Sequence, residues 1–341
     1  MDAEDMGPKG RFNERYDILT RKVVRSLSQD SRLSVTDVSA ATGSYRRKIK
    51  ERMARAEKEL GIRYTIEFNE SALGLNNPHI VLVKLAPKSD IGEIASVLGS
   101  SCVPQMVALA SGQYDLVIYA NALSSAEYVH WDKTTQVKLS KYIDLWEPSD
   151  IAHRQLGFFP IRNELLGKLK LPEEHMQLLM ELNKNSRLPA GKLARSLGLP
   201  QSTLAYRLRG IMDEGYIKRF TLVMDKLGGV SSVGFFGKYA IKEGFETDAS
   251  RQRQSFFADD RFPISNRYIF VSQLVGSYDF FAIGVFDSFN AAYREGVLNY
   301  RKNMKRHLVR LRNAEIKKVI LGSITIRSLD VEREYNTIKW V

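Results

Sequence analysis

Asp30-Ser31-Arg32-Leu33 and Asn185-Ser186-Arg187-Leu188 are two versions of one short segment, and this repetition is the main indication of how the 341-residue chain is organised. A second segment, Gly112-Gln113-Tyr114-Asp115-Leu116, returns as Gly276-Ser277-Tyr278-Asp279-Phe280. The two segments alternate along the chain. A repeat of this kind indicates that a unit of two unlike modules has been duplicated.

The residues around the first segment predict three helices. Apolar residues recur at helical spacing from Ile18 to Leu27 and stop at Asp30. Ser34 then has the position of a helix N-cap, with Asp37 three residues later as a loose capping box. Gly43 suits the turn before a third helix, expected over 45–60. Three helices with a tight glycine turn before the last resemble a helix-turn-helix.

The second copy predicts the same arrangement, with helices over 175–185, 190–197 and 201–214. Pro200 suits the start of the third helix. Aligning the third helices places Arg52 on Arg207, Ile49 on Leu204, Lys48 on Thr203 and Arg47 on Ser202. The two copies differ in the exposed positions.

The third helix of a helix-turn-helix supplies the side chains that reach base edges, and flanking cations bind phosphates. The first copy is strongly basic here, whereas the second presents a neutral polar face. Loss of Arg47 and Arg52 is expected to weaken binding to all DNA, and changes at Ser202 or Thr203 to alter sequence preference. The predicted DNA-binding residues are Arg46, Arg47, Lys48, Lys50, Arg52, Arg55, Gln201, Ser202, Thr203, Tyr206, Arg207 and Arg209. The alternative is a generic helical bundle whose charges only solvate it.

After each helical module, alternating β-branched and aromatic residues predict strands. In the first copy the order strand, helix, strand, strand, helix, strand is expected over 79–86, 89–98, 104–110, 114–120, 124–140 and 143–151. In the second copy it is expected over 233–241, 248–257, 268–275, 278–286, 291–307 and 316–326. This βαββαβ order is that of a ferredoxin-like domain.

The predicted fold class is therefore α+β. Two winged-helix-like helix-turn-helix domains, over 13–68 and 170–226, alternate with two ferredoxin-like ligand-binding and dimerisation domains, over 77–156 and 231–328.

The Gly-x-Tyr-Asp motif in each ferredoxin-like module makes the chain resemble the Lrp/AsnC family of feast/famine transcription regulators, written twice in tandem. Arg52 and Arg207 match an arginine of the family's third helix, and Gly74 and Gly228 match a glycine after the following strand. The resemblance implies a regulator that binds double-stranded DNA and forms a homodimer or a higher homo-oligomer. It also implies a small amino-acid-like effector, bound near Gly112, Tyr114, Asp115, Gly276, Tyr278 and Asp279.

The same motif has a purely structural interpretation. Glycine at the bend between two strands adopts a positive φ without strain, and the aspartate can accept backbone amides that hold the turn. Core packing is the first expectation for Tyr114 and Tyr278.

Composition favours a polyanionic partner, because 51 Lys and Arg residues outnumber 39 Asp and Glu residues and give a net charge of +12. Cys102 is the only cysteine, so neither an internal disulfide nor a cysteine-rich zinc site is expected. The first residues lack the apolar core of a signal peptide, and the longest apolar runs are of strand length. We expect a cytoplasmic protein without membrane segments.

An enzyme is the main alternative, because siroheme decarboxylases resemble this architecture and use His and Arg beside a tetrapyrrole carboxylate. The five histidines, His79, His130, His153, His175 and His307, are scattered, and no phosphate-binding glycine loop is found. Packed or exposed histidines are the first expectation, although His130 and His153 could line a pocket. No catalysis, metal or cofactor is predicted; a small-molecule sensor without DNA binding is a further alternative.

Three features leave alternatives open. Two binding domains in one chain could pair with each other, so the stoichiometry is undecided. The 330–341 tail could be an added strand, an oligomer contact or disordered. A basic run on the last predicted helix and the following turn is either a solvated face or a phosphate contact for wrapped DNA; it comprises Arg294, Arg301, Lys302, Lys305, Arg306, Arg310 and Arg312.

Overall fold

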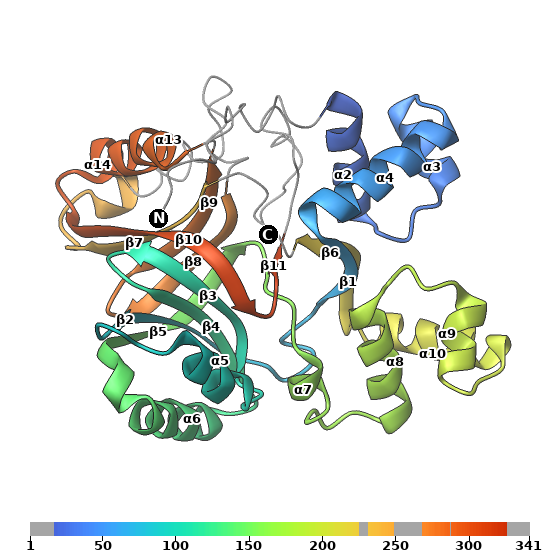
Figure 1. Ribbon diagram of the computed structural model, residues 1–341, viewed down its shortest axis with the longest axis horizontal. Coiled ribbons are helices and arrows are strands. Elements are labelled where there is room, and N and C mark those ends of the chain that lie inside the picture. Colours follow the sequence, from blue (N-terminus) through green and yellow to red (C-terminus); the bar gives the residue numbers. More distant parts are fainter. Residues whose placement is uncertain (1–16, 225–230, 249–267, 287, 326–341) are drawn as a thin grey trace.

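The computed structural model describes residues 17–224, 231–248, 268–286 and 288–325 (Figure 1). Two groups of helices lie on one side of the molecule, and a barrel of strands lies on the other. A small sheet lies between the two helical groups. Each half of the sequence contributes one helical group and one half of the barrel.

The first helical group contains α2 (Ile18–Gln29), α3 (Val35–Thr42) and α4 (Arg46–Leu60), followed by strand β1 (Ile62–Phe68). The predicted capping box is present, because the Ser34 hydroxyl accepts the Asp37 amide while the Asp37 carboxylate accepts the Ser34 amide. Gly43 ends α3 with a φ of 65°, a left-handed conformation that glycine adopts without strain. The three helices predicted for this segment are confirmed.

The second helical group contains α7 (Asn163–Leu166), α8 (Glu173–Lys184), α9 (Ala190–Ser196) and α10 (Gln201–Asp213), followed by strand β6 (Ile217–Met224). Pro200 is the N-cap of α10. The three longer helices were predicted from the sequence, whereas the short α7 was not.

The wing strands that follow the third helices pair with each other. β1 runs antiparallel to β6 with Thr65 opposite Thr221, and the short strand β11 (Ile324–Thr325) adds to the outer edge of β6. Leu222 and Met224 of β6 pack into the core of the first helical group. Each helical group is thus completed in part by a strand from the other half of the chain.

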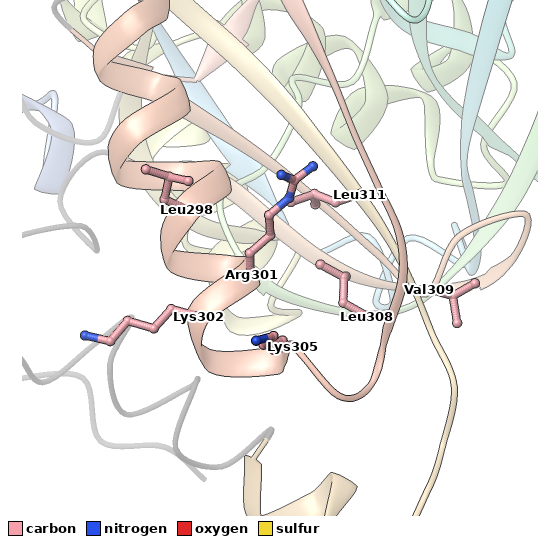
Figure 2. A pocket seen from close by; sticks show the side chains of 7 residues that line it. All are labelled: Leu298, Arg301, Lys302, Lys305, Leu308, Val309 and Leu311. Carbon is pink, nitrogen blue, oxygen red and sulfur yellow. The ribbon is translucent and has the colours of Figure 1, made fainter.

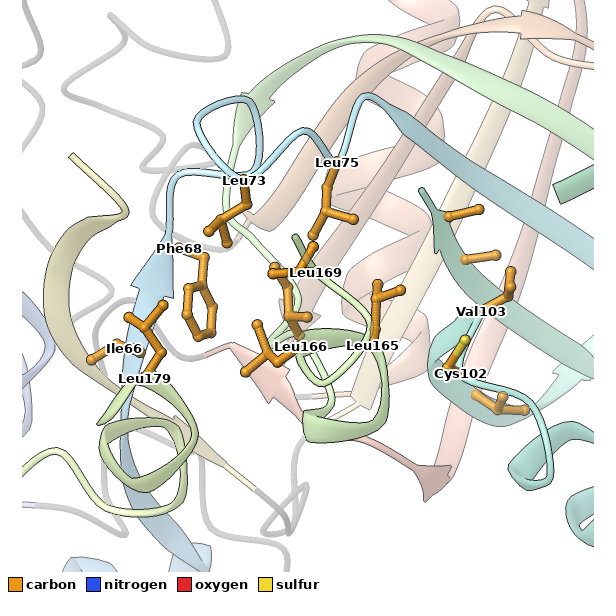
Figure 3. Packing of buried hydrophobic residues seen from close by; sticks show 14 of the residues in the cluster. Ile66, Phe68, Leu73, Leu75, Cys102, Val103, Leu165, Leu166, Leu169 and Leu179 are labelled. Carbon is orange, nitrogen blue, oxygen red and sulfur yellow. The ribbon is translucent and has the colours of Figure 1, made fainter. Parts of the chain in front are cut away.

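The reciprocal packing is visible at the second helical group (Figure 3). Ile66 and Phe68 of β1 lie in one buried cluster with Leu179 of α8, and Leu166 of α7 lies in the same cluster. This cluster continues to Val103 at the wall of the barrel. A continuous apolar core therefore connects the first wing, the second helical group and the barrel.

Eight antiparallel strands close the barrel in the order β10-β3-β4-β2-β5-β8-β9-β7. Their bounds are β2 (Asn77–Leu85), β3 (Pro104–Gly112), β4 (Leu116–Ala122), β5 (Ile143–Leu156), β7 (Ser231–Tyr239), β8 (Tyr268–Gly276), β9 (Phe280–Phe286) and β10 (Leu308–Leu321). The two halves of the sequence meet where β5 pairs with β8 and where β10 pairs with β3. Closure leaves none of these eight strands as an edge.

At strand β2, both faces of the barrel wall are buried. Ile80 and Leu82 of β2 belong to the interior cluster, whereas Val81 and Val83 belong to the cluster beneath the outer helices, as the alternation of a strand requires. Helices α5 (Ile91–Gly99) and α6 (Ser125–Lys138) lie outside the first half of the barrel. Helix α13 (Phe289–Ala292), the π-helix η2 (Tyr293–Val297) and α14 (Leu298–Met304) lie outside the second.

Strand β10 departs from the sequence prediction because it begins at Leu308 rather than at Ile316. Its first part pairs with β7 and its last part with β3, so long-range pairing extends it across both halves. Arg310 and Arg312 consequently lie on a strand, and their assignment to the turn after the last helix was wrong. Gly228, the stretch from 249 of the helix predicted over 248–257, and the 330–341 tail lie outside the described residues.

Candidate nucleic-acid interface and the seam between the halves

The first turns of α4 expose the basic side chains predicted to bind DNA. Arg46, Arg47, Lys48 and Lys50 are all exposed, while Ile49 between them is fully buried and anchors the helix. The guanidinium of Arg47 pairs with Glu51 one turn later at 3.1 Å, but its side chain is 91% exposed. This face of α4 is open to a large polyanion.

The start of α10 exposes a different set of side chains. Gln201, Ser202 and Arg209 are exposed, Thr203 is half-buried, and Tyr206 is 77% exposed. The two third helices therefore present one strongly basic and one mainly polar face, as predicted from their sequences.

Arg52 and Arg207 are engaged within their own helical groups. Arg52 pairs with Asp17 at the start of α2 at 2.6 Å, and Arg207 pairs with Glu174 in the first turn of α8 at 3.0 Å. Both arginine side chains are less than one-third exposed. These equivalent residues thus join α4 to the start of α2 and α10 to α8. Their role in DNA binding stays a prediction, as does that of Arg55, which pairs with Glu59 at 2.8 Å.

The Asp17–Arg52 contact alters the titration of the carboxylate. Partial burial raises the pKa of Asp17, but hydrogen bonds from Thr20 and the charges of Arg52 and Arg55 outweigh burial and lower this pKa overall. The contact is therefore an ion pair at neutral pH.

The repeated Ser-Arg segment forms the contact between the two helical groups. The Ser31 and Ser186 hydroxyls share a hydrogen bond of 2.6 Å in a buried position. The guanidinium of Arg187 donates to the Leu33 carbonyl at 2.9 Å and lies 5.1 Å from the centre of the Tyr64 ring. The segment that reveals the duplication is thus the segment through which the copies touch.

The tyrosines of the Gly-x-Tyr-Asp motifs meet inside the barrel. The hydroxyls of Tyr114 and Tyr278 are hydrogen-bonded to each other, and both side chains are 1% exposed. Tyr114 also donates to Glu147 of β5. Burial, followed by these hydrogen bonds, raises the pKa of Tyr114 well above its ordinary value. Both residues belong to the barrel core, which confirms the structural interpretation for the tyrosines.

The aspartates of the motifs bind the neighbouring strand. Asp115 accepts the Leu85 amide at 2.9 Å and the Lys84 ammonium at 3.0 Å. Asp279 repeats this with the Tyr239 amide at 2.7 Å and the Lys238 ammonium at 2.8 Å. The expectation that these carboxylates hold their own turn was wrong, because the amides that they accept come from β2 and β7.

The glycines of the motifs lie at the seam between the halves of the barrel. Gly112 and Gly276 have φ values of 122° and 138°. A Cβ on Gly112 would lie 3.1 Å from the Asn313 carbonyl oxygen of β10, and one on Gly276 would lie 3.1 Å from the Cα of Ser149 of β5. Glycine is thus required both by backbone conformation and by the close approach of the other half.

A cavity of about 220 Å³ lies where the chain passes between the barrel and the helical groups. Glu70, in the turn after β1, pairs there with Arg154 of β5 at 2.5 Å. The other carboxylate oxygen of Glu70 accepts the Tyr119 hydroxyl and the Asn121 amide, both at 2.9 Å. His153 also lines this cavity, in agreement with the alternative considered for it. No spacing in the sequence pointed to Glu70, Tyr119, Asn121 and Arg154, because the turn after β1 and the strands β4 and β5 bring them together only in the folded chain.

The described part of the chain contains no group of three or more His, Cys, Asp or Glu side chains arranged to hold a metal ion. In the same residues, no helix combines the length and hydrophobicity needed to cross a membrane.

A family model described as winged helix-turn-helix DNA-binding matches residues 175–218, which include α9 and α10. An uncharacterized HTH-type transcriptional regulator of Pyrococcus furiosus is 42% identical over 45 residues, which are 13% of this chain and 30% of that protein. A similarly described regulator of Pyrococcus abyssi is 41% identical over 46 residues, 14% of this chain and 31% of that protein. The chain thus spans under one-third of the length of these relatives.

Two solved structures are similar over longer stretches. The siroheme decarboxylase NirDL has a TM-score of 0.58 and 11% identity, covering 92% of this chain and 94% of that chain, and so shares the fold. An AsnC family transcriptional regulator from Agrobacterium tumefaciens has a TM-score of 0.37 and 20% identity, covering 41% of this chain and 92% of that chain. Residues 175–218 are therefore similar to winged helix-turn-helix DNA-binding domains, and the chain as a whole shares the fold of NirDL.

Proposed function

We propose that this chain is a sequence-specific DNA-binding transcription regulator. Its two helix-turn-helix and two ferredoxin-like domains take the place of the two subunits of a dimer. The pairing of β1 with β6 gives the main support, because it joins two helical groups that each expose their DNA-reading helix, α4 or α10. The buried Ser31–Ser186 contact supports the same joining.

Binding begins with electrostatic capture of DNA by the cations of α4, followed by seating of the third helices in the major groove. The basic face of α4 suits phosphates, whereas Ser202 and Thr203 of α10 suit hydrogen bonds to bases. A chain with two different reading helices binds an asymmetric site or two unlike half-sites.

Regulation by a small amino-acid-like effector is the second part of the proposal. Gly112 and Gly276 lie at the seam where the halves of the barrel meet, so an effector that shifts this seam would change the spacing of the reading helices. The protein is proposed to act in the cytoplasm without catalysis, and to form homodimers or higher homo-oligomers.

Fluorescence anisotropy of the full chain with labelled duplex DNA at several salt concentrations tests the proposal. Affinity is expected to fall steeply with salt, and the variant Arg46→Ala/Arg47→Ala/Lys48→Ala to bind all duplexes more weakly with a slope reduced by roughly one per lost phosphate contact. The control is Lys88→Ala/Lys138→Ala/Lys170→Ala, which removes the same charge from exposed positions outside the third helices. No binding at low salt, or equal losses in both variants, would contradict the proposal.

A siroheme-decarboxylase-like enzyme is the second candidate, and the whole-chain likeness to NirDL favours it. Anaerobic incubation of the purified protein with siroheme, followed by chromatography of the tetrapyrroles, distinguishes the candidates. Loss of carboxyl groups from siroheme without DNA binding would replace the regulator with the enzyme. A small-molecule sensor is the candidate left if neither activity is found.

A further inference from the structure

A groove of about 570 Å³ lies between α14 and the start of β10, on the outside of the barrel (Figure 2). Its described lining combines four aliphatic side chains with three cationic ones and contains no carboxylate: Leu298, Arg301, Lys302, Lys305, Leu308, Val309 and Leu311. Figure 2 shows Arg301 extending from the helix toward Leu311 and Lys305 near Leu308, whereas Lys302 points away from these residues. The volume is in the range of small-molecule sites.

The three cations of this groove are exposed, and no ion pair or hydrogen bond joins them to another residue in the described part of the chain. The neighbouring Arg306, by contrast, pairs with Asp248 at 2.7 Å. Two exposed apolar side chains accompany the cations, since Leu298 is 46% and Val309 is 66% exposed. Positive charge and apolar surface are thus both available to a ligand in one groove.

The first half of the chain contains the same backbone elements without this chemistry. Ile143 of β5 lies opposite Leu85, and Leu308 of β10 lies opposite the equivalent Tyr239, so the two strands are in register. Counting back from these strands aligns Arg301, Lys302 and Lys305 with Gln136, Val137 and Ser140. The two copies therefore differ at these three positions, which are cationic in the second half and uncharged in the first.

The helix that carries the cations also differs in backbone between the copies. In the first half, α6 follows its N-cap Ser124 as a continuous α-helix. In the second half, the stretch from the N-cap Ser288 to the strand at Leu308 is one residue longer, and the π-helix η2 lies directly before Leu298. A π-helical turn accommodates one inserted residue and is frequent at functional sites.

We propose that this groove binds a small amphipathic anion, a ligand with one carboxylate or phosphate head and an aliphatic body. The head is held by Arg301 and Lys305, and the body lies on the leucines and Val309. This inference is independent of DNA binding by the third helices, which belong to the other side of the molecule (Figure 1).

Isothermal titration of the full chain with octanoate tests the proposal, with octanol and inorganic phosphate as probes that each lack one feature. Octanoate is expected to bind, and the other two to bind more weakly. The variant Arg301→Gln/Lys302→Val/Lys305→Ser gives the groove the residues of the first half. It is expected to bind octanoate roughly tenfold more weakly or worse, because charge-assisted hydrogen bonds to the head are lost.

The matched control is Lys88→Gln/Lys138→Gln/Lys170→Gln, which removes the same charge elsewhere and should leave octanoate binding unchanged. Val309→Asp changes one exposed residue without removing a cation and should also weaken binding. Thermal unfolding verifies that each variant is folded. The proposal is overturned if octanoate does not bind or if the groove variant binds octanoate as tightly as the parent. If octanoate does not bind and the groove variant also loses DNA affinity, the cations of the groove bind DNA instead.

Discussion

Ser31 and Ser186 occupy the same position in the two copies of the repeat, and their hydroxyls meet at 2.6 Å in the contact between the two helical groups. In the part of the chain that the structure describes, neither hydroxyl has another hydrogen-bond partner, and both residues are fully buried. The two copies of the repeat therefore touch through equivalent atoms. It also makes the stability of one helical group depend on the other.

Replacing either serine is expected to destabilise the protein by about 1 kcal/mol, because the remaining hydroxyl is left buried without its partner. The double variant Ser31→Ala/Ser186→Ala should cost less than the sum of the single variants. Urea unfolding of the four proteins measures this coupling. Ser100→Ala, at an exposed hydroxyl that donates to the Val97 carbonyl, is the control; strictly additive costs would contradict the coupling.

The buried tyrosine pair predicts unequal effects of two equivalent substitutions. Tyr114→Phe removes the partner of both Tyr278 and Glu147, whereas Tyr278→Phe leaves the bond between Tyr114 and Glu147 intact. Tyr114→Phe should therefore cost more, about 1–3 kcal/mol of unfolding free energy. Chemical denaturation compares the two variants, and a larger cost for Tyr278→Phe would show that the asymmetry is wrong.

The Asp17–Arg52 ion pair predicts a loss of stability in acid. Because the folded pKa of Asp17 lies below its unfolded value near 3.9, its contribution is present above that pH and is lost as pH falls through the folded pKa. Asp17→Asn should reduce stability by up to about 1 kcal/mol at pH 7, since the pair is partly exposed. Thermal unfolding from pH 7 to 3 should show a shallower acid decline in the variant; parallel profiles would exclude the pair as its cause.

The polar cluster around Glu70 predicts one of the larger single-residue effects in the first half. Glu70→Ala leaves the half-buried Arg154 without its counter-charge and two further donors without an acceptor, at a cost of about 3–5 kcal/mol. The double variant Glu70→Gln/Arg154→Met should recover part of this loss. Urea unfolding tests both, with the exposed Glu164→Gln as a control for loss of one carboxylate.

Local sequence patterns predicted the elements well where a signal lies within a few residues. The capping box of Ser34 and Asp37, the glycine at position 43 and the periodicity of α2 each report a short-range interaction. The apolar run from Ile80 to Val83 likewise predicted a strand, and all four side chains are buried in the structure. The candidate DNA-contacting side chains of α4 could be predicted for the same reason, because helical periodicity alone separates exposed Arg47 from buried Ile49.

The duplication, most of the helices and strands, and the contrast between a basic α4 and a mainly polar α10 can all be recognised from the amino-acid sequence alone. Three contacts became visible only in the folded chain: each wing strand packs against the other half, Arg52 pairs with Asp17, and Asp115 binds the strand ending at Leu85. The physical reason is that strand pairing and ion pairing join atoms far apart in the chain, and periodicity within one element carries no information about its partner.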